Sequence, residues 1–182
     1  MRTFLAILLS EKTRALLAEC SEELKATGAD VKWVEEENFH ITLCFFGDIS
    51  PDTCDSIINK MPQMTSGLKP FPVSFYGMGA FPNLRKPKVI WAGVKKGKRE
   101  IIEVHRKILP VIQSLGFEEK KKYTPHVTMG RVRSPANLES MISLIEKCQF
   151  IGEDWIQGIS LMESVLTPKG AKYSEMAFSK FK

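Results

Sequence analysis

The stretch that tells most about the fold is residues 39–46, which read FHITLCFF and are followed by Gly47 and Asp48. Aromatic and β-branched residues dominate this run, which predicts a buried strand closed by a turn. Side chains alternate along a strand, so His40 and Thr42 share one face while Ile41 and Leu43 share the other. The run therefore predicts an imidazole and a hydroxyl held side by side above an apolar core.

The same phrase occurs a second time, at residues 125–130, which read PHVTMG. His126 and Thr128 stand here as His40 and Thr42 do in the first phrase. The chain has only 3 histidines in 182 residues, and two of them lie in this phrase. A single His-x-Thr on a strand is more often a packed or surface pair, but two copies in register indicate a function.

The elements around the two phrases follow the same order. The first half predicts strand 3–9, a helix capped by Ser10, a strand near 31–35, the first motif strand, a helix opened by Ser50-Pro51, and a strand near 72–78. The second half predicts strand 88–94, helix 98–115, the second motif strand, a helix opened by Ser134-Pro135, a strand region 155–166, and a last strand at 173–180.

The spacing within the two halves also agrees. Phe4 and His40 are 40 − 4 = 36 residues apart, and Ile90 and His126 are 126 − 90 = 36 residues apart. An internal duplication accounts for this agreement, with repeat units of about 1–80 and 88–165 and a final strand at 173–180.

We therefore expect an α+β fold in a single two-lobed catalytic domain of residues 1–182. It would be bilobal and internally duplicated, with two antiparallel sheets facing a central cleft and the helices on the outside. Halves related in this way tend to pack about a pseudo-twofold axis. The two motifs would then face each other across one cleft.

Composition restricts the class of protein. The net charge of +5 and the pI near 9.0 suit a polyanionic partner, although such an excess also occurs on unrelated proteins. The 4 cysteines show no metal-site spacing, which indicates free thiols in a reducing compartment. The apolar run at residues 4–9 is too short for a signal peptide or a membrane span. We expect a cytoplasmic protein that does not contact membranes.

The motif residues suit chemistry at an anionic phosphorus centre. Hydroxyls donate to phosphoryl oxygens, and an imidazole with a pKa near ~6.5 exchanges a proton close to neutrality. Zinc usually takes three or four protein ligands, and two imidazoles alone make a poor metal site. We therefore expect no metal and no cofactor.

Two further residues are candidates of different kinds. Arg131 follows the second motif closely and is placed to clamp a phosphate, although a solvated arginine at a strand end is a comparable interpretation. His105 lies between Ile101 and Ile108 on the buried stripe of the helix at 98–115, which favours a packing role.

At these motifs the chain resembles the two-histidine phosphoesterase superfamily, which is defined by two His-x-Thr/Ser-hydrophobic motifs. More narrowly, it is similar to the prokaryotic RNA 2′,3′-cyclic phosphodiesterases, also called 2′-5′ RNA ligases. The matching stretches are RTFLAI at 2–7, EENFHITLCFFG at 36–47, TPHVTMGR at 124–131 and LTPKG at 166–170. The likeness spans nearly the whole chain.

The resemblance implies a function and a set of roles. A terminal RNA 2′,3′-cyclic phosphate would be hydrolysed to a 2′-phosphate without a metal ion. His40 would protonate the leaving 3′ oxygen, His126 would activate water, and Thr42 and Thr128 would hold the phosphoryl oxygens. Arg131 corresponds to an arginine that commonly follows the second motif. The partner would be RNA with 2′,3′-cyclic phosphate ends, tRNA-derived or another small RNA, without an obligate protein partner.

Two alternatives stay open from the sequence. The first is an enzyme of the same class, either a 2′-5′ RNA ligase or a hydrolase of another nucleotide cyclic phosphate. The second is a non-catalytic module that binds RNA ends through the same residues.

Overall fold

A computed structural model describes residues 1–119, 121–168 and 170–182 of the chain. Lys169, part of the stretch at 166–170, lies outside the described residues. The helices are α1 (Glu11–Lys25), α2 (Pro51–Thr65), α3 (Lys98–Ser114) and α4 (Leu138–Lys147), with the short 3₁₀ helix η1 (Glu36–Asn38). The strands are β1 (Arg2–Leu8), β2 (Val31–Trp33), β3 (His40–Asp48), β4 (Phe71–Phe81), β5 (Val89–Val94), β6 (His126–Val132), β7 (Phe150–Ile156), β8 (Gly158–Thr167) and β9 (Gly170–Lys180).

Local signals set the starts of the first two helices. The Ser10 hydroxyl accepts a hydrogen bond from the backbone N–H of Thr13 at 3.2 Å, and Ser50 caps α2 in the same way through Thr53. Pro51 occupies the first helical turn, where its missing N–H costs nothing. These two caps were predicted from the sequence, and the structure confirms them.

All strands in the described part of the chain join in one antiparallel sheet, in the order β7-β4-β5-β6-β3-β1-β8-β9, with β2 paired to β6. The expectation of two separate sheets is therefore wrong. The join is made at the centre, where Ile41 of β3 pairs with Val127 of β6. Both side chains are fully buried, so the apolar faces of the two halves merge there into one core.

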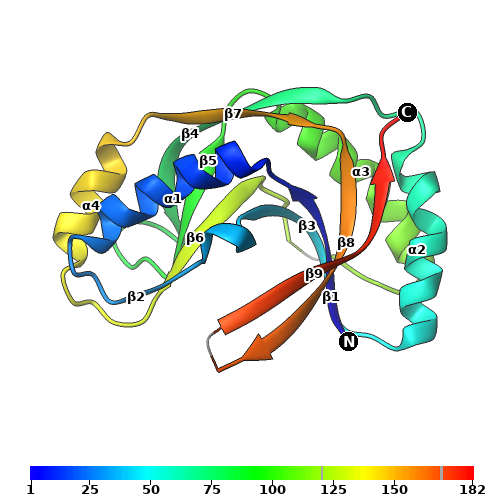
Figure 1. Cartoon of the computed structure of the whole chain (residues 1–182), viewed down its shortest axis with the longest axis horizontal. Helices are drawn as coiled ribbons and strands as arrows, with labels where there is room; N and C mark the ends of the chain where they lie inside the picture. The colour runs from blue at the N-terminus through cyan, green and yellow to red at the C-terminus, as the bar shows by residue number, and fades with distance from the viewer. Residues whose placement is uncertain (120, 169) are drawn as a thin grey trace.

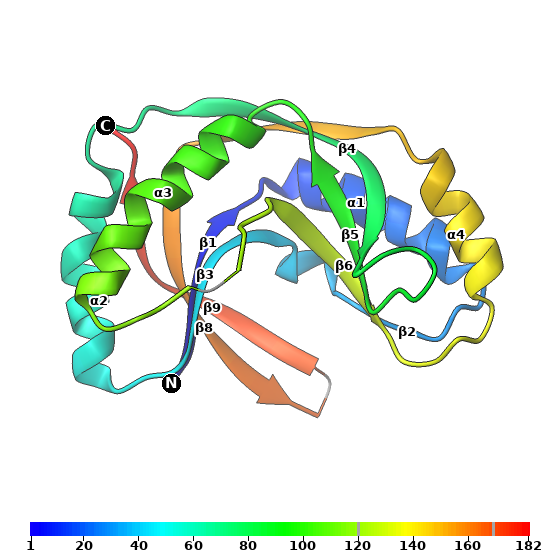
Figure 2. The ribbon, with the colours of Figure 1, turned by 180° about the vertical axis from the view of Figure 1, so that it is seen from behind.

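The helices cover the sheet in two pairs, one at each end (Figures 1 and 2). α1 and α4 pack together against β7 and β4, while α2 packs against α3 and β9. α1 follows β1 in the chain but packs against β7, near the other end of the sheet. Each end of the sheet is therefore built from segments of both the first and the second half of the chain. The outer part of the β8–β9 hairpin projects away from the body (Figure 1).

Two expected boundaries in the second half are wrong. α4 begins at Leu138 behind Asn137, a residue with a φ of 56°, rather than at Ser134-Pro135. The Ser134 hydroxyl instead accepts a bond from the N–H of Ala136, a local turn that competes with helix. The strand region at 155–166 is divided after Ile156, because β7 pairs with β4 whereas β8 pairs with β1.

The four cysteines are free thiols, as expected. In the part of the chain that the structure describes, no helix is long and apolar enough to cross a lipid bilayer.

We expect Ile41→Ala to lower the free energy of unfolding by about 2–5 kcal/mol, and Ile41→Val by about 0.5–1.5 kcal/mol, because Ile41 fills the core where the halves join. Urea denaturation measures both. As a control, Val165→Ala at a side chain that is 48% exposed should change stability by less than about 0.5 kcal/mol. An equal loss in the two alanine variants would contradict a buried join.

Candidate active site

The two predicted motifs lie at the first residues of the two central strands, β3 and β6. His40 and Thr42 are half-buried on one face of β3, and Ile41 behind them is fully buried. His126 and Thr128 are half-buried in the same alternation on β6. The structure thus bears out the alternation that the sequence predicted.

The register of the sheet sets the four motif side chains next to one another. Because β3 and β6 run antiparallel with Ile41 opposite Val127, His40 is the neighbour of Thr128, and Thr42 is the neighbour of His126. The two histidines occupy diagonal corners of this quartet. Diagonal Cα atoms in a regular ladder are about 7–8 Å apart.

A backbone carbonyl orients each imidazole. The Nδ1 of His40 lies 2.6 Å from the carbonyl oxygen of Asn38, and the Nδ1 of His126 lies 2.7 Å from that of Thr124. A carbonyl oxygen can only accept, so Nδ1 carries the proton and Nε2 of the neutral ring is an acceptor. The Thr42 hydroxyl, 3.0 Å from Nε2 of His40, therefore donates to it.

Both histidines favour their neutral form. Burial lowers the pKa of His40, the Asn38 carbonyl raises it in part, and a charge on His126 lowers it further. Burial lowers the pKa of His126 as well, against the contribution of the Thr124 carbonyl. A bound phosphate would act in the opposite direction, because a nearby negative charge favours the protonated ring.

A cavity of about 250 Å³ opens over these strands. His40, Thr42, Thr128 and Arg131, all predicted from the sequence, line it. His126 is beside this group by register but does not line the cavity, and its ring meets the edge of Phe81 at 5.0 Å between centroids.

A bulge in each central strand re-aims the residue that follows the motif. Met129 is the extra residue in β6, because Trp91 pairs with Thr128 and Ile90 with Gly130. Strict alternation would turn Arg131 away from Thr128, and the bulge returns it to the cavity face. Leu43 is the extra residue in β3, between the Thr42 and Cys44 that pair with β1.

The bulge at Leu43 explains why Phe45, which the sequence did not single out, faces the cavity. Phe45 lies 45 − 40 = 5 residues after His40, as Arg131 lies 131 − 126 = 5 after His126, and Phe45 also lines the cavity. Its ring is 53% exposed, with the Arg2 guanidinium 5.1 Å above it. The signal available in the sequence was the equal offset of these two residues from the histidines of the two motifs.

Tyr173 of the β8–β9 hairpin was also missed. Its ring meets that of His40 edge-on at 5.4 Å. Burial raises the pKa of its hydroxyl, while the charges of Arg131 and Arg2 lower it. The Asn38 side chain donates to the carbonyl of Ala171 at 2.9 Å, which ties the hairpin to the residues before β3. No local pattern marks these long-range contacts.

The cavity presents cations and hydroxyls to a ligand. None of the described residues that line it carries a carboxylate. Within residues 1–119, 121–168 and 170–182, no group of three or more His, Cys, Asp and Glu side chains is placed to hold a metal ion. The arrangement suits a phosphate-sized anion in contact with the His40 ring, with the second imidazole, that of His126, close by on the neighbouring strand.

Comparisons with known proteins agree with this geometry. The family described as LigT like Phosphoesterase matches residues 7–91, a segment that includes the first motif. A Methanothermobacter thermautotrophicus protein named RNA 2′,3′-cyclic phosphodiesterase is 36% identical, covering 97% of this chain and 96% of its own. A protein of the same name from Archaeoglobus fulgidus is 33% identical, covering 97% and 98%.

Solved structures share the fold over the whole chain. A Thermus thermophilus protein superposes with a TM-score of 0.84 at 25% identity, covering 100% of this chain and 98% of its own. Escherichia coli LigT complexed with 3′-AMP has a TM-score of 0.77 at 18% identity, covering 99% and 97%.

Paired His-x-Thr strands at the centre of a curved antiparallel sheet define the class of two-histidine phosphoesterases. Within this class, the chain belongs to the family of LigT-like phosphoesterases.

In the free protein, we expect NMR titration to give both His40 and His126 a pKa below the ordinary value of about 6.5, because burial penalises the charged rings. Nitrogen chemical shifts at pH 8 should show the proton on Nδ1. Inorganic phosphate should raise both values. A pKa at or above 6.5 for either ring in the free, folded protein would contradict the burial described.

Proposed function

We propose that this protein is an RNA 2′,3′-cyclic phosphodiesterase, in which His40 and His126 transfer protons on opposite sides of the phosphorus atom. The observation that carries the proposal is the diagonal placement of the two imidazoles on neighbouring strands, with His40 in a cavity that also presents two hydroxyls and an arginine, and His126 beside that group by register. In-line displacement needs a base beside the entering oxygen and an acid beside the leaving one. Diagonal corners supply both.

The reaction balances with water as the only co-reactant. The water oxygen forms a bond to phosphorus and loses a proton to the neutral Nε2 of one histidine. The bond from phosphorus to the 3′ oxygen breaks, and that oxygen takes a proton from the other histidine in its charged form. The product is a 2′-phosphate with a free 3′-hydroxyl, and a second proton exchange restores both rings.

By family analogy we assign His126 as the base and His40 as the acid. Thr42 and Thr128 donate to the phosphoryl oxygens, and Arg131 neutralises their charge. Binding of the anionic phosphate favours protonation of the nearby imidazole, which the acid requires. The lowered pKa of the free rings keeps the base unprotonated near neutrality.

The proposal includes the organisation of the chain. Residues 1–182 form one catalytic domain that arose from two repeat units, about 1–80 and 88–165. Features that occur once in each proposed repeat unit support this origin: a His-x-Thr strand, a bulge (at Leu43 and at Met129), and a backbone carbonyl bonded to Nδ1 of the histidine. We place its substrate among tRNA-derived or other small RNAs in the cytoplasm.

We expect His40→Ala and His126→Ala each to lower kcat by about 10²–10⁴-fold, the usual value of a general acid or base. The assay follows conversion of a short RNA ending in a 2′,3′-cyclic phosphate to its 2′-phosphate product. The double variant should be little worse than either single variant, because the two rings act in one step.

Circular dichroism of these variants and a Lys60→Ala control, at an exposed residue of α2, separates activity from folding. EDTA should leave the wild-type rate unchanged. Tight binding of the RNA end without product after long incubation would contradict catalysis and favour the binding-module alternative. Near-full activity in either histidine variant would remove that residue from the mechanism.

A further inference from the structure

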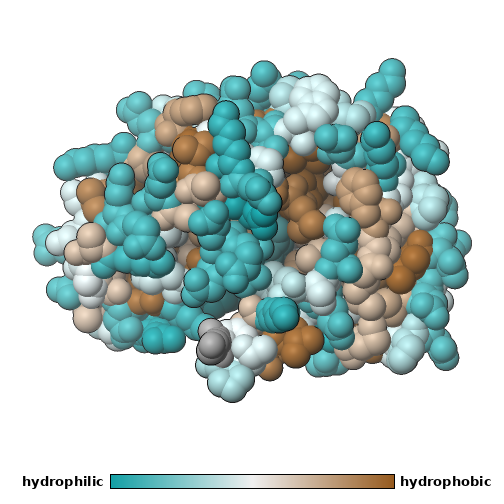
Figure 3. All heavy atoms as spheres, in the orientation of Figure 1, coloured by the Kyte–Doolittle hydropathy of each residue, from teal (hydrophilic) through white to brown (hydrophobic). Residues whose placement is uncertain are grey.

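A second groove opens directly beside the catalytic cavity. Its volume is about 460 Å³, and it lies between β2, the end of β6 and the β8–β9 hairpin. Six residues line both spaces and make them continuous: Val34, Asn38, Arg131, Leu166, Ala171 and Tyr173. The surface is hollowed beside the hairpin tip, with hydrophilic residues on the facing part of the body (Figure 3).

Positive charge gathers along this groove. Its described lining includes four cationic residues, Lys25, Lys32, Arg131 and Arg133. Glu35 is the one acidic residue in that described lining. Lys32 and Arg131 are direct cross-strand partners, a like-charge pair that is unfavourable unless an anion is shared. In the part of the chain that the structure describes, no carboxylate forms an ion pair with Lys32, Arg131 or Arg133.

Apolar and aromatic side chains also line the groove. Trp33 of β2 and Tyr173 of the hairpin line it, together with Leu166, whose side chain is 71% exposed. Cationic grooves with aromatic side chains bind single-stranded nucleic acid through its phosphates and the faces of its bases. The groove has both features.

The chemistry of the substrate gives the direction of the strand. A 2′,3′-cyclic phosphate occupies both hydroxyls of its ribose, so the rest of the RNA is attached only through the 5′ phosphate. We infer that the second groove binds the RNA strand on the 5′ side of the cyclic end. This inference rests on the proposed function, and it makes an oligonucleotide rather than a cyclic mononucleotide the preferred substrate.

The test compares a mononucleotide 2′,3′-cyclic phosphate with a four-nucleotide RNA carrying the same end. The wild-type protein should turn over the RNA with a kcat/KM at least about tenfold higher in low salt. Lys32→Gln/Arg133→Gln should lower kcat/KM for the RNA about tenfold and leave the mononucleotide within twofold. Lys60→Gln/Lys98→Gln, with equal loss of charge at exposed residues of α2 and α3, should behave as wild type.

The outcomes separate the two proposals. Absence of turnover for both substrates would contradict the proposed function itself. Equal wild-type efficiency on both substrates would overturn the groove while the phosphodiesterase activity stands. An equal loss on both substrates in Lys32→Gln/Arg133→Gln would place the terminal nucleotide in the groove, which also overturns the inference.

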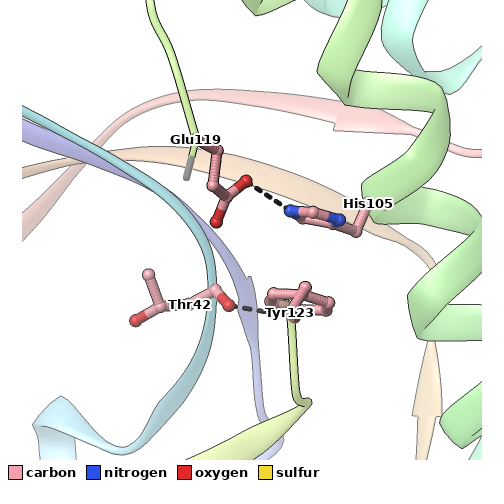
Figure 4. Close-up of polar contacts among 4 residues, drawn as sticks. All are labelled: Thr42, His105, Glu119 and Tyr123. Carbon is pink, nitrogen blue, oxygen red and sulfur yellow. Dashed lines mark hydrogen bonds and ion pairs between the residues drawn. The ribbon is translucent and has the colours of Figure 1, made fainter. Parts of the chain in front are cut away.

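A different set of contacts lies on the α3 side of the motifs (Figure 4). The Tyr123 hydroxyl donates to the backbone carbonyl of Thr42 at 3.0 Å. The Tyr123 ring stacks on that of His105, with centroids 3.9 Å apart and planes 6° apart. Nε2 of His105, a residue only 5% exposed, lies 2.6 Å from a carboxylate oxygen of Glu119.

The contacted carbonyl lies at the join between the halves. Within the described residues, β3 and β6 pair at one position, Ile41 with Val127. Thr42 is the next residue along β3, and Tyr123 lies three residues before His126 on the approach to β6. The Tyr123 bond is therefore a second link between the segments that carry the two motifs.

We propose that Tyr123 is a positioning residue for the reaction, held in place by His105 and Glu119. Its hydroxyl sets the separation of the two imidazoles without touching substrate. Small errors in such a separation cost large factors in rate, because the acid and the base must both reach the phosphoryl group.

Tyr123→Phe removes the hydroxyl and keeps the ring stacked on His105. We expect kcat to fall about tenfold, with KM within twofold of wild type and a nearly unchanged Tm. Tyr76→Phe, at a tyrosine that is 38% exposed on β4, is the matched control and should leave kcat unchanged. An unchanged kcat in Tyr123→Phe would overturn the proposal.

His105→Gln and Glu119→Gln test the support for the ring. Each should lower kcat less than Tyr123→Phe does, and neither should add to it in a double variant. Additive losses would show that His105 and Glu119 act independently of Tyr123, which contradicts their proposed support of its ring. A fall in Tm that accounts for the lost activity would assign them a structural role only.

Discussion

The pairing of Ile41 with Val127 is the constraint on which the rest of the molecule depends. It joins the two halves of the strand system into one sheet, and both side chains are fully buried in the common core. One antiparallel pair sets the register of its neighbours. The same contact that closes the core therefore brings together four polar side chains from positions far apart in the chain.

Backbone groups, rather than ion pairs, hold these side chains. Each imidazole donates to a carbonyl oxygen two residues earlier, and a bulge in each strand turns Arg131 and Phe45 toward the cavity. A carboxylate partner would also orient an imidazole, but it would repel an anionic substrate and raise the histidine pKa. A carbonyl orients the ring without adding a full charge.

We infer that substrate affinity and catalytic geometry depend on different parts of the protein. Lys32 and Arg133 line the second groove, where their charge would attract a polyanion at little structural cost. His105 and Tyr123 lie on the α3 side, where their rings stack and His105 is buried. Such a division lets substrate binding vary while the spacing of the proton-transfer groups is preserved.

The sequence by itself determined the local features. The alternation that sets His40 and Thr42 against buried Ile41, the cap at Ser10 and the recurrence of the motif all follow from residues close together in the chain. It also identified the family. The single sheet, the hairpin over the site and the contacts of Tyr123 depend on pairings between distant segments, and local propensity carries no information about these. The sequence did not predict the bulges for a related reason. One extra residue changes which face of the strand the following residues occupy, but in a largely apolar run such as residues 43–46 the order of apolar and polar residues does not reveal the change.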